Sequence, residues 1–201
     1  MPILGLTGGI ATGKTTFAPL LLNQLPEAKH FDSDRCVHEL LAEDRIVGEK
    51  ILKAFGDKVF GDDGRPSRQK LRETIFADAG CRKTLESIIH PIVRHRWNAE
   101  VVEARRSSAW LLVDIPLLYE TGAQSEFDRV IVVACPRETQ INRLNCQRGL
   151  ALELAATIIA TQLDIDAKTQ LADHVIWNDS TVSNLNGQSE LLAAWLKRHL
   201  G

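Results

Sequence analysis

Residues 8–15 read Gly-Gly-Ile-Ala-Thr-Gly-Lys-Thr and fit the pattern GxxxxGK[S/T]. They follow an apolar run at 3–6 and precede a helical pattern at 15–25. This is the strand–loop–helix setting that a phosphate-binding loop requires. Backbone N–H groups of such a loop, together with the N-terminus of the helix, attract phosphate oxygens. We therefore expect the loop to bind a nucleoside triphosphate.

Two side chains of the loop have tasks of their own. Lys14 is expected to reach the outer phosphates, and Thr15 to hold a magnesium ion. The ligands expected at this site are therefore a nucleoside triphosphate and Mg²⁺. The loop residues expected to bind the nucleotide are Gly9, Ala11, Thr12, Gly13, Lys14, Thr15 and Thr16.

Five short apolar runs predict the strands of an α/β fold. They lie at 3–7, 28–31, 111–115, 129–134 and 174–177, and segments with helical spacing separate them. This alternation predicts a five-stranded parallel sheet that carries the phosphate loop, with helices on both faces. Because their apolar residues are nearly continuous, we expect the strands to be buried on both faces.

Two stretches are too long for a single crossover helix and predict insertions. The first separates the second and third strands and has helical spacing at 34–41, 46–55, 68–76 and 81–106. The second, 143–168, is also helical by pattern. We therefore expect a nucleotide-binding core (1–34, 107–142 and 169–201), a helical substrate subdomain (35–106) and a helical lid (143–168).

Composition limits the classes of partner. The chain has 201 residues, with 24 basic against 26 acidic side chains and few aromatic residues. A polycationic or base-stacking nucleic-acid binder is therefore not expected. The four cysteines have no zinc-site spacing, and there is no signal-peptide pattern or long apolar stretch. We expect reduced thiols, a cytoplasmic protein, no membrane span, and a small-molecule substrate.

The loop alone leaves open whether the nucleotide is used by an enzyme or by a regulator. Switch GTPases need NKxD and DxxG segments, and neither occurs in this sequence. A small-molecule kinase needs a base, cations around the transferred phosphoryl group and a lid that excludes water. Candidates for all three are present, so a kinase is favoured over a non-catalytic nucleotide-binding regulator.

Carboxylates follow the second strand. Asp32 and Asp34 lie at the predicted carboxyl edge of the sheet, where open α/β folds bind their ligands. One could serve as the base for the acceptor hydroxyl and the other as an indirect magnesium ligand. The alternative is that one of them only caps the following helix.

Other charged residues follow the third and fourth strands. Asp114 directly follows an apolar run and could be aimed at magnesium through water, or it could simply start a turn with Pro116. Arg143 and Arg148 lie in a helical segment, where charges usually face solvent. Of the two, Arg143 is the better placed to swing over a phosphate.

The chain resembles dephospho-coenzyme A kinase over nearly its whole length. The resemblance rests on the TGGI opening at 7–10, Asp-Ser-Asp at 32–34, His-Pro at 90–91, Pro-Leu-Leu-Tyr-Glu at 116–120 and Ala-Asp-His-Val-Ile-Trp-Asn at 172–178. It implies a nucleoside-monophosphate-kinase-like fold that phosphorylates the ribose 3′-hydroxyl of dephospho-CoA with ATP, the last step of coenzyme A synthesis.

The resemblance also implies roles for individual residues. Asp34 matches the catalytic base, Lys14 and Arg143 match the groups that neutralise the transferred phosphoryl group, and Thr15 matches the magnesium ligand, with Asp32 and Asp114 nearby. Asn178 falls near the adenine. The positions that match the acceptor site are Thr7, Asp34, His90, Arg94, Leu117 and Leu118.

The chain departs from the family pattern at two places. Ala11 and Thr12 replace the usual Gly and Ser, which should be tolerated if Ala11 has a negative φ. In the lid, Gln147 replaces an Arg and Ile158 stands where another Arg is usual, before Gln162. The sequence is compatible with either a monomer or a weak homo-oligomer.

Overall fold

A parallel five-stranded sheet forms the centre of the fold, as expected. The computed structural model describes all 201 residues, apart from the side chains of Phe76, Ala77 and Ala79. The strand order is β2-β3-β1-β4-β5. The strands are β1 (Ile3–Gly8), β2 (Lys29–Asp32), β3 (Leu111–Asp114), β4 (Arg129–Ala134) and β5 (His174–Trp177).

The helices are α1 (Lys14–Gln24), α2 (Ser33–Glu43), α3 (Arg45–Phe55), α4 (Arg68–Ala77), α5 (Ala79–Ser107), α6 (Arg137–Arg148), α7 (Leu152–Ala160), α8 (Ile165–Leu171) and α9 (Val182–Leu200). Helices α1 to α5 match the predicted segments with shifts of a few residues at their ends, the stretch predicted as helical at 143–168 is divided among α6, α7 and α8, and α9 was not predicted. Short 3₁₀ turns occur at Asp57–Val59 and Gln124–Glu126. The predicted lid thus covers the end of α6, all of α7 and most of α8.

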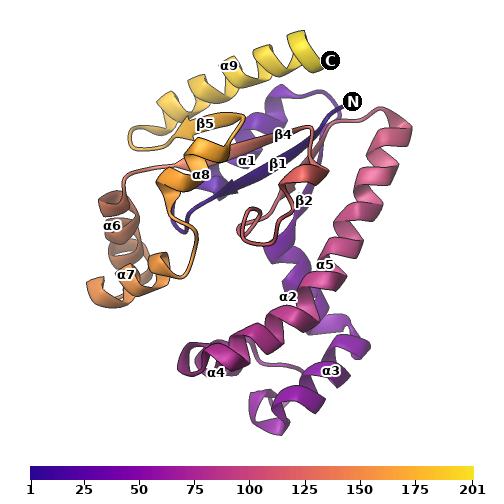
Figure 1. The fold of residues 1–201 in the computed structure, drawn as a ribbon, viewed down its shortest axis with the longest axis vertical. Helices are drawn as coiled ribbons and strands as arrows, with labels where there is room; N and C mark the ends of the chain where they lie inside the picture. The colour runs from indigo at the N-terminus through magenta and orange to yellow at the C-terminus, as the bar shows by residue number, and fades with distance from the viewer. The chain divides into compact units, whose positions relative to one another are not determined.

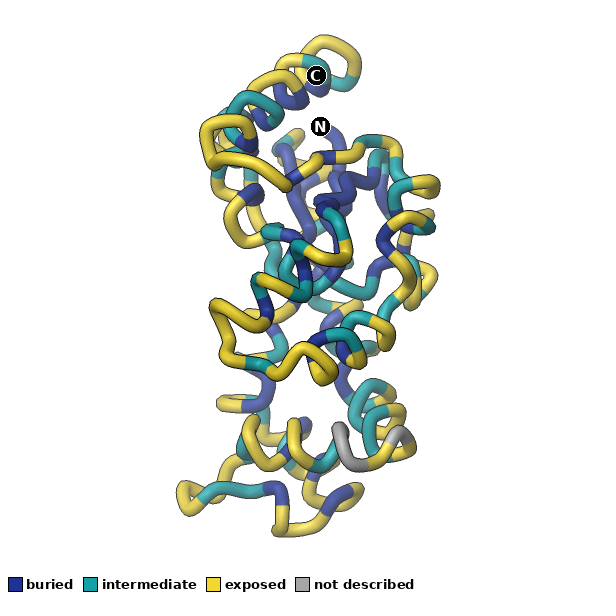
Figure 2. The backbone as a smooth tube through the Cα atoms, turned by 90° about the vertical axis from the view of Figure 1, so that its left-hand side faces the viewer, coloured by how far each residue is buried: buried dark blue, intermediate teal, exposed yellow. Residues whose placement is uncertain are grey.

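Alternate residues of the central strands pack on opposite faces of the sheet. On one face, Leu6 and Ile131 join a core that α1 and α9 complete, and α9 lies along this face as the yellow helix in Figure 1. On the other face, Val132 and Ala134 pack against Ile165 of α8. Figure 2 shows the dark-blue, buried backbone concentrated in this sheet. Both faces of the central strands are therefore covered, as a parallel sheet requires.

The expectation that all five strands are buried on both faces is wrong for β2 and β5. These strands lie at the two edges of the sheet, and Val175 and Trp177 of β5 are exposed by 42% and 45%. In β2, Lys29 and His30 are also exposed. An edge strand has a neighbour on one side only, so an apolar run does not by itself indicate a buried strand.

The chain divides into two compact units. The first contains Met1–Phe31 and Glu100–Gly201, and so carries the sheet and the phosphate loop; the second contains Asp32–Ala99. In the second unit, Asp44 ends α2 and begins α3, where its carboxylate accepts hydrogen bonds from Ile46 N at 3.0 Å and Val47 N at 3.1 Å. This single carboxylate therefore fixes the corner between two helices.

Candidate functional site

The phosphate loop joins β1 to α1 and takes two left-handed residues. Gly13 has φ 98° and precedes the first helical residue, Lys14. Ala11 has φ 58°, so the condition under which alanine replaces glycine here without strain is not met. The path of the loop requires the left-handed region here, and alanine adopts it at a cost that glycine does not incur.

Three side chains from two other segments hold the carbonyl groups of the loop. Gln140 of α6 donates from Nε2 to the Ile10 carbonyl at 2.8 Å. Arg143, one turn further along the helix, donates from Nη1 to the Ala11 carbonyl at 3.1 Å and the Thr12 carbonyl at 3.3 Å. Asn178, directly after β5, donates from Nδ2 to the Thr12 carbonyl at 2.8 Å. The loop is therefore fixed from its outer side.

These hydrogen bonds determine where the loop's N–H groups point. In a trans peptide, a carbonyl and the N–H of the next residue lie on opposite sides, and no peptide bond in the described part of the chain is cis. Holding the Ile10 and Thr12 carbonyls outward thus turns the Ala11 and Gly13 N–H groups inward. The N-terminus of α1 has no side-chain cap hydrogen bond, so its first N–H groups add to the same concave surface.

The glycines of the loop are needed for close packing as well as for conformation. A Cβ on Gly9 would overlap Gln140 Nε2, and a Cβ on Gly13 would overlap Asn178 Nδ2. A Cβ on Gly8 would overlap the Val133 carbonyl of β4. The donors that hold the loop can therefore approach it only because these positions lack side chains.

Arg143 is engaged differently from the sequence expectation of an arginine that swings over a phosphate. Besides the two loop carbonyls, its Nη2 donates to the Asn178 carbonyl at 2.9 Å. A guanidinium has five N–H donors, so these contacts leave donors for a phosphate. In this structure Arg143 fastens the phosphate loop to the segment after β5.

A thiol lies beside the same guanidinium. Arg143 Nη1 is 3.7 Å from Cys135 Sγ. Burial raises the pKa of the fully buried Cys135 thiol to about 11, and the nearby positive charge of Arg143 opposes this only in part. The thiol is therefore protonated at neutral pH and is not a nucleophile of the site.

Asp114 and Thr7 lie next to the loop at the carboxyl ends of adjacent strands. Asp114 ends β3, pairs in register with Leu6 of β1, and is only 9% exposed. Thr7 is fully buried, and its hydroxyl donates to the Pro116 carbonyl at 3.1 Å. Both predicted site residues are thus held at the sheet edge that carries the phosphate loop.

The predicted acceptor residues Leu117 and Leu118 differ in exposure. Leu117 is partly exposed, whereas the Leu118 side chain is fully buried. A Cβ on Gly5 would come within 2.9 Å of Leu118 Cδ1, so this side chain packs against β1. If Leu118 contacts an acceptor, it would therefore do so through its backbone.

Four predicted site residues lie in the second unit. Asp32 caps α2, because its Oδ1 accepts a hydrogen bond from Arg35 N at 3.0 Å. Asp34 is exposed in the first turn of α2. His90, which is partly exposed, and the exposed Arg94 lie on α5, where Arg94 is 5.9 Å from the ring centre of Trp97. The capping alternative therefore applies to Asp32.

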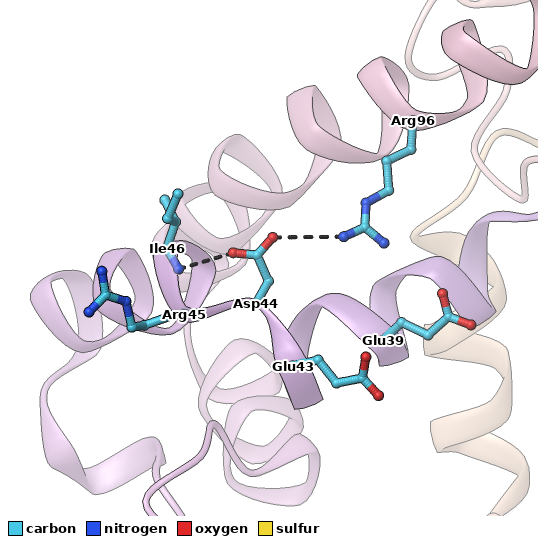
Figure 3. A pocket seen from close by; sticks show the side chains of 6 residues that line it. All are labelled: Glu39, Glu43, Asp44, Arg45, Ile46 and Arg96. Carbon is cyan, nitrogen blue, oxygen red and sulfur yellow. Dashed lines mark hydrogen bonds and ion pairs between the residues drawn. The ribbon is translucent and has the colours of Figure 1, made fainter.

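An open hollow of about 510 Å³ also lies in the second unit (Figure 3). Its lining is Glu39, Glu43, Asp44, Arg45, Ile46 and Arg96. Figure 3 shows Asp44 between Ile46 N and Arg96, which it pairs with at 3.7 Å. The hollow contains none of the predicted site residues, and its Asp44–Arg96 pair links the corner between α2 and α3 to α5.

Sequence reasoning missed three side chains of the site. Gln140 holds the loop as described, and Gln162 accepts a hydrogen bond from Ile10 N at 3.0 Å through Oε1. Lys168 is fully buried and donates to the Gly8 carbonyl at 3.4 Å. A signal was present for two of them: Gln140 lies four residues before the buried Leu144, and Lys168 lies three after Ile165, so both occupy the inward stripe of a helix.

No helix in the described part of the chain has both the length and the apolar character needed to cross a membrane.

Comparison with known proteins gives one consistent result. The family model described as "Dephospho-CoA kinase" matches residues 2–184. A dephospho-CoA kinase of Symbiobacterium thermophilum is 41% identical over 196 residues, which are 97% of this chain and 80% of that protein. Another, of Methylococcus capsulatus, is 35% identical over 96% of this chain and 95% of that one.

Solved structures agree with the sequence comparison. The dephospho-CoA kinase from Campylobacter jejuni has a TM-score of 0.71 and 27% identity, covering 97% of this chain and 96% of that one. A shikimate kinase from Acinetobacter baumannii, at 17% identity and a TM-score of 0.54 with 100% and 96% coverage, shares the fold. With the phosphate loop in place and the family model matched almost from end to end, the chain belongs to the dephospho-CoA kinase family.

Proposed function

We propose that Lys14, Arg143 and Asp34 carry out the chemistry of this kinase. The family assignment makes the chain an enzyme that phosphorylates dephospho-CoA with ATP, the last step of coenzyme A biosynthesis. The roles of single residues, and the use of magnesium, are the proposal. The observation that supports it most directly is the phosphate loop, with inward N–H groups and an uncapped helix beginning at Lys14.

The donor side of the reaction uses the first unit. The N–H groups of Ala11 and Gly13 and the start of α1 would bind the phosphates of ATP, and Lys14 would neutralise charge on the transferred group. The donors of Arg143 that the loop does not use would add to this. Asn178, fixed by its bond to Thr12, would lie near the adenine.

Magnesium would be held by the hydroxyl of Thr15, with Asp32 or Asp114 acting through water. These are hard oxygen donors, which this ion prefers, and Thr15 is exposed while Asp114 is buried at a strand end. When bound, the ion would neutralise charge on the phosphates. Asp32 also caps α2 through its Oδ1.

The acceptor side uses Asp34 as the base. The ribose 3′-oxygen forms a bond to the terminal phosphorus, the bond from that phosphorus to the ADP oxygen breaks, and the hydroxyl proton passes to the Asp34 carboxylate. Thr7, His90, Arg94, Leu117 and Leu118 would hold the acceptor. The substrate is a small molecule, and the helical segment 143–168 would act as the lid that excludes water.

Asp34→Asn tests the base. Asparagine suits the first turn of a helix nearly as well as aspartate, so we expect an intact fold and similar ATP affinity, with kcat lower by about 100-fold or more. ADP release would be coupled to an indicator, with dephospho-CoA, adenylate, shikimate and gluconate as acceptors. Asp57→Asn, at an exposed aspartate of the same unit as Asp34 and outside the proposed site, is the matched control. Near-normal turnover of Asp34→Asn would remove the proposed base.

A further inference from the structure

Lys168 is a fully buried lysine at the edge of the phosphate site. Its Nζ donates to Glu120 Oε1 at 2.9 Å, to the Pro116 carbonyl at 3.0 Å and to the Gly8 carbonyl at 3.4 Å. An ammonium group has three N–H donors, and these three acceptors account for all of them. Lys168 therefore has no hydrogen left for a phosphate and acts through the groups that it holds.

The electrostatics of Lys168 agree with this position. Burial lowers the pKa of its ammonium, as does the positive charge of Lys14, and the hydrogen bond and negative charge of Glu120 oppose them. A charge this deeply buried is costly unless a partner compensates it. Glu120 is that partner, so the two side chains form a unit.

Glu120 also binds the connection between α7 and α8. Its Oε1 accepts a second hydrogen bond, from Leu163 N at 2.8 Å. The preceding residue, Gln162, binds Ile10 N of the phosphate loop. Residues 162–168, which we call the clip, thus contact the phosphate loop through Gln162 and Lys168, and contact segment 116–120 through Leu163 and Lys168.

The Pro116 carbonyl is held from two sides. Lys168 binds it from α8, and the Thr7 hydroxyl binds it from the end of β1 at 3.1 Å. Pro116 to Glu120 is the segment that contains the proposed acceptor residues Leu117 and Leu118. Its position relative to the phosphate loop is therefore set by Lys168, which touches both Pro116 and Gly8.

We infer that Lys168, paired with Glu120, is a positioning residue that places segment 116–120 against the phosphate loop so that the acceptor meets the transferred phosphoryl group. The inference rests on the proposed function for its substrate. It assigns a fixed role in the site to the clip, which is one part of the proposed lid. Misplacement of an acceptor by about 1 Å is enough to lower the rate about 100-fold.

The kinetic test uses Lys168→Met, with Lys197→Met as control. Lys197 is an exposed lysine in the last turn of α9. We expect Lys168→Met to lower kcat/KM for dephospho-CoA by about tenfold or more. ATP affinity should change by less than about threefold, because Gln140, Arg143 and Asn178 still hold the loop. The Lys197→Met control should leave both quantities unchanged.

A second variant separates positioning from stability. Lys168→Met leaves the Glu120 carboxylate, whose side chain is 22% exposed, without its cation, which destabilises the fold, whereas Lys168→Met/Glu120→Gln also removes that unpaired charge. We expect the double variant to regain much of the lost stability in thermal denaturation but to keep the low kcat/KM. If kcat/KM returns with stability, or if ATP affinity falls as much as kcat/KM, the positioning role is wrong.

A third readout does not depend on catalysis. The amides of Thr121, Gly122 and Ala123 donate to the Leu117, Tyr119 and Leu118 carbonyls and report on segment 116–120. Hydrogen exchange at these amides in the ligand-free protein should rise about tenfold or more in Lys168→Met or, if that variant does not fold, in Glu120→Gln. Unchanged exchange would overturn the inference. Failure of the wild type to phosphorylate dephospho-CoA would instead overturn the proposed function and leave this measurement valid.

Discussion

Ala11 stores backbone strain that glycine would release. A left-handed conformation costs an L-residue about 1–2 kcal/mol, and Ala11 has φ 58°. Glycine pays no such cost in the folded chain, but it makes the unfolded chain more flexible, which offsets about 0.4–1 kcal/mol. Ala11→Gly should therefore raise the free energy of unfolding by about 0–1.5 kcal/mol.

A matched substitution isolates the effect of φ. Ala194 is exposed in α9, within the same unit as Ala11, and has helical backbone angles. Ala194→Gly loses the same methyl group and gains the same flexibility in the unfolded chain. It should destabilise by about 1 kcal/mol, the usual cost of glycine inside a helix. The changes in the free energy of unfolding caused by the two substitutions should thus have opposite signs, or should differ by at least about 1–2 kcal/mol.

Thermal denaturation can resolve this difference. For a chain of this length, 1 kcal/mol corresponds to a shift of about 2–4 °C in Tm, so the two variants should lie at least about 3 °C apart. The Ala11 carbonyl still accepts from Arg143 in Ala11→Gly, so ATP affinity should not change. If both variants lose stability equally, Ala11 is not strained.

Two further predictions concern the second unit and the pH dependence of stability. Asp44→Ala removes the cap of α3 and should lower the free energy of unfolding, measured by urea denaturation, by about 1–2 kcal/mol. The control Asp62→Ala, at an exposed loop position, should change this free energy by less than about 0.5 kcal/mol. Equal losses in the two variants would contradict the capping role. Burial lowers the pKa of His174, with a smaller contribution from Arg129 and opposition from Asp173, so the folded state favours the neutral ring. This stabilisation is present above the pKa of His174 in the unfolded state and is lost as the pH falls through and below that value. His174→Phe should therefore reduce the loss of stability between pH 7 and pH 5. An unaltered dependence of the free energy of unfolding on pH would rule out the effect.

The phosphate loop and the sheet could be predicted because their signals are local. A glycine-rich pattern between an apolar run and a helical pattern identifies residues 8–15 with no knowledge of the rest of the chain. Strand burial could not be predicted in the same way. It depends on strand order, and β2 and β5 prove to be edges although their apolar character resembles that of the central strands.

The residues that hold the loop were harder to predict, because their partners are backbone atoms far away in sequence. Gln140 and Ile10 are 130 residues apart, and Lys168 and Gly8 are 160 apart. No side-chain pattern near Gly8 or Ile10 indicates such a donor. A lysine in a short helix is usually solvated, and only its place on the inward stripe distinguishes Lys168.

Net charge illustrates the same limit. The formal charge of −2 suggests no attraction for phosphates, yet two of the side chains that bind loop carbonyls, Arg143 and Lys168, are cations. Each draws a backbone oxygen outward and also places positive charge behind the loop. Because a planar peptide turns its N–H away from its carbonyl, the same contacts orient the phosphate-binding groups before any nucleotide arrives. Affinity for phosphate thus follows from where a few donors lie, and the charge summed over the chain does not determine it.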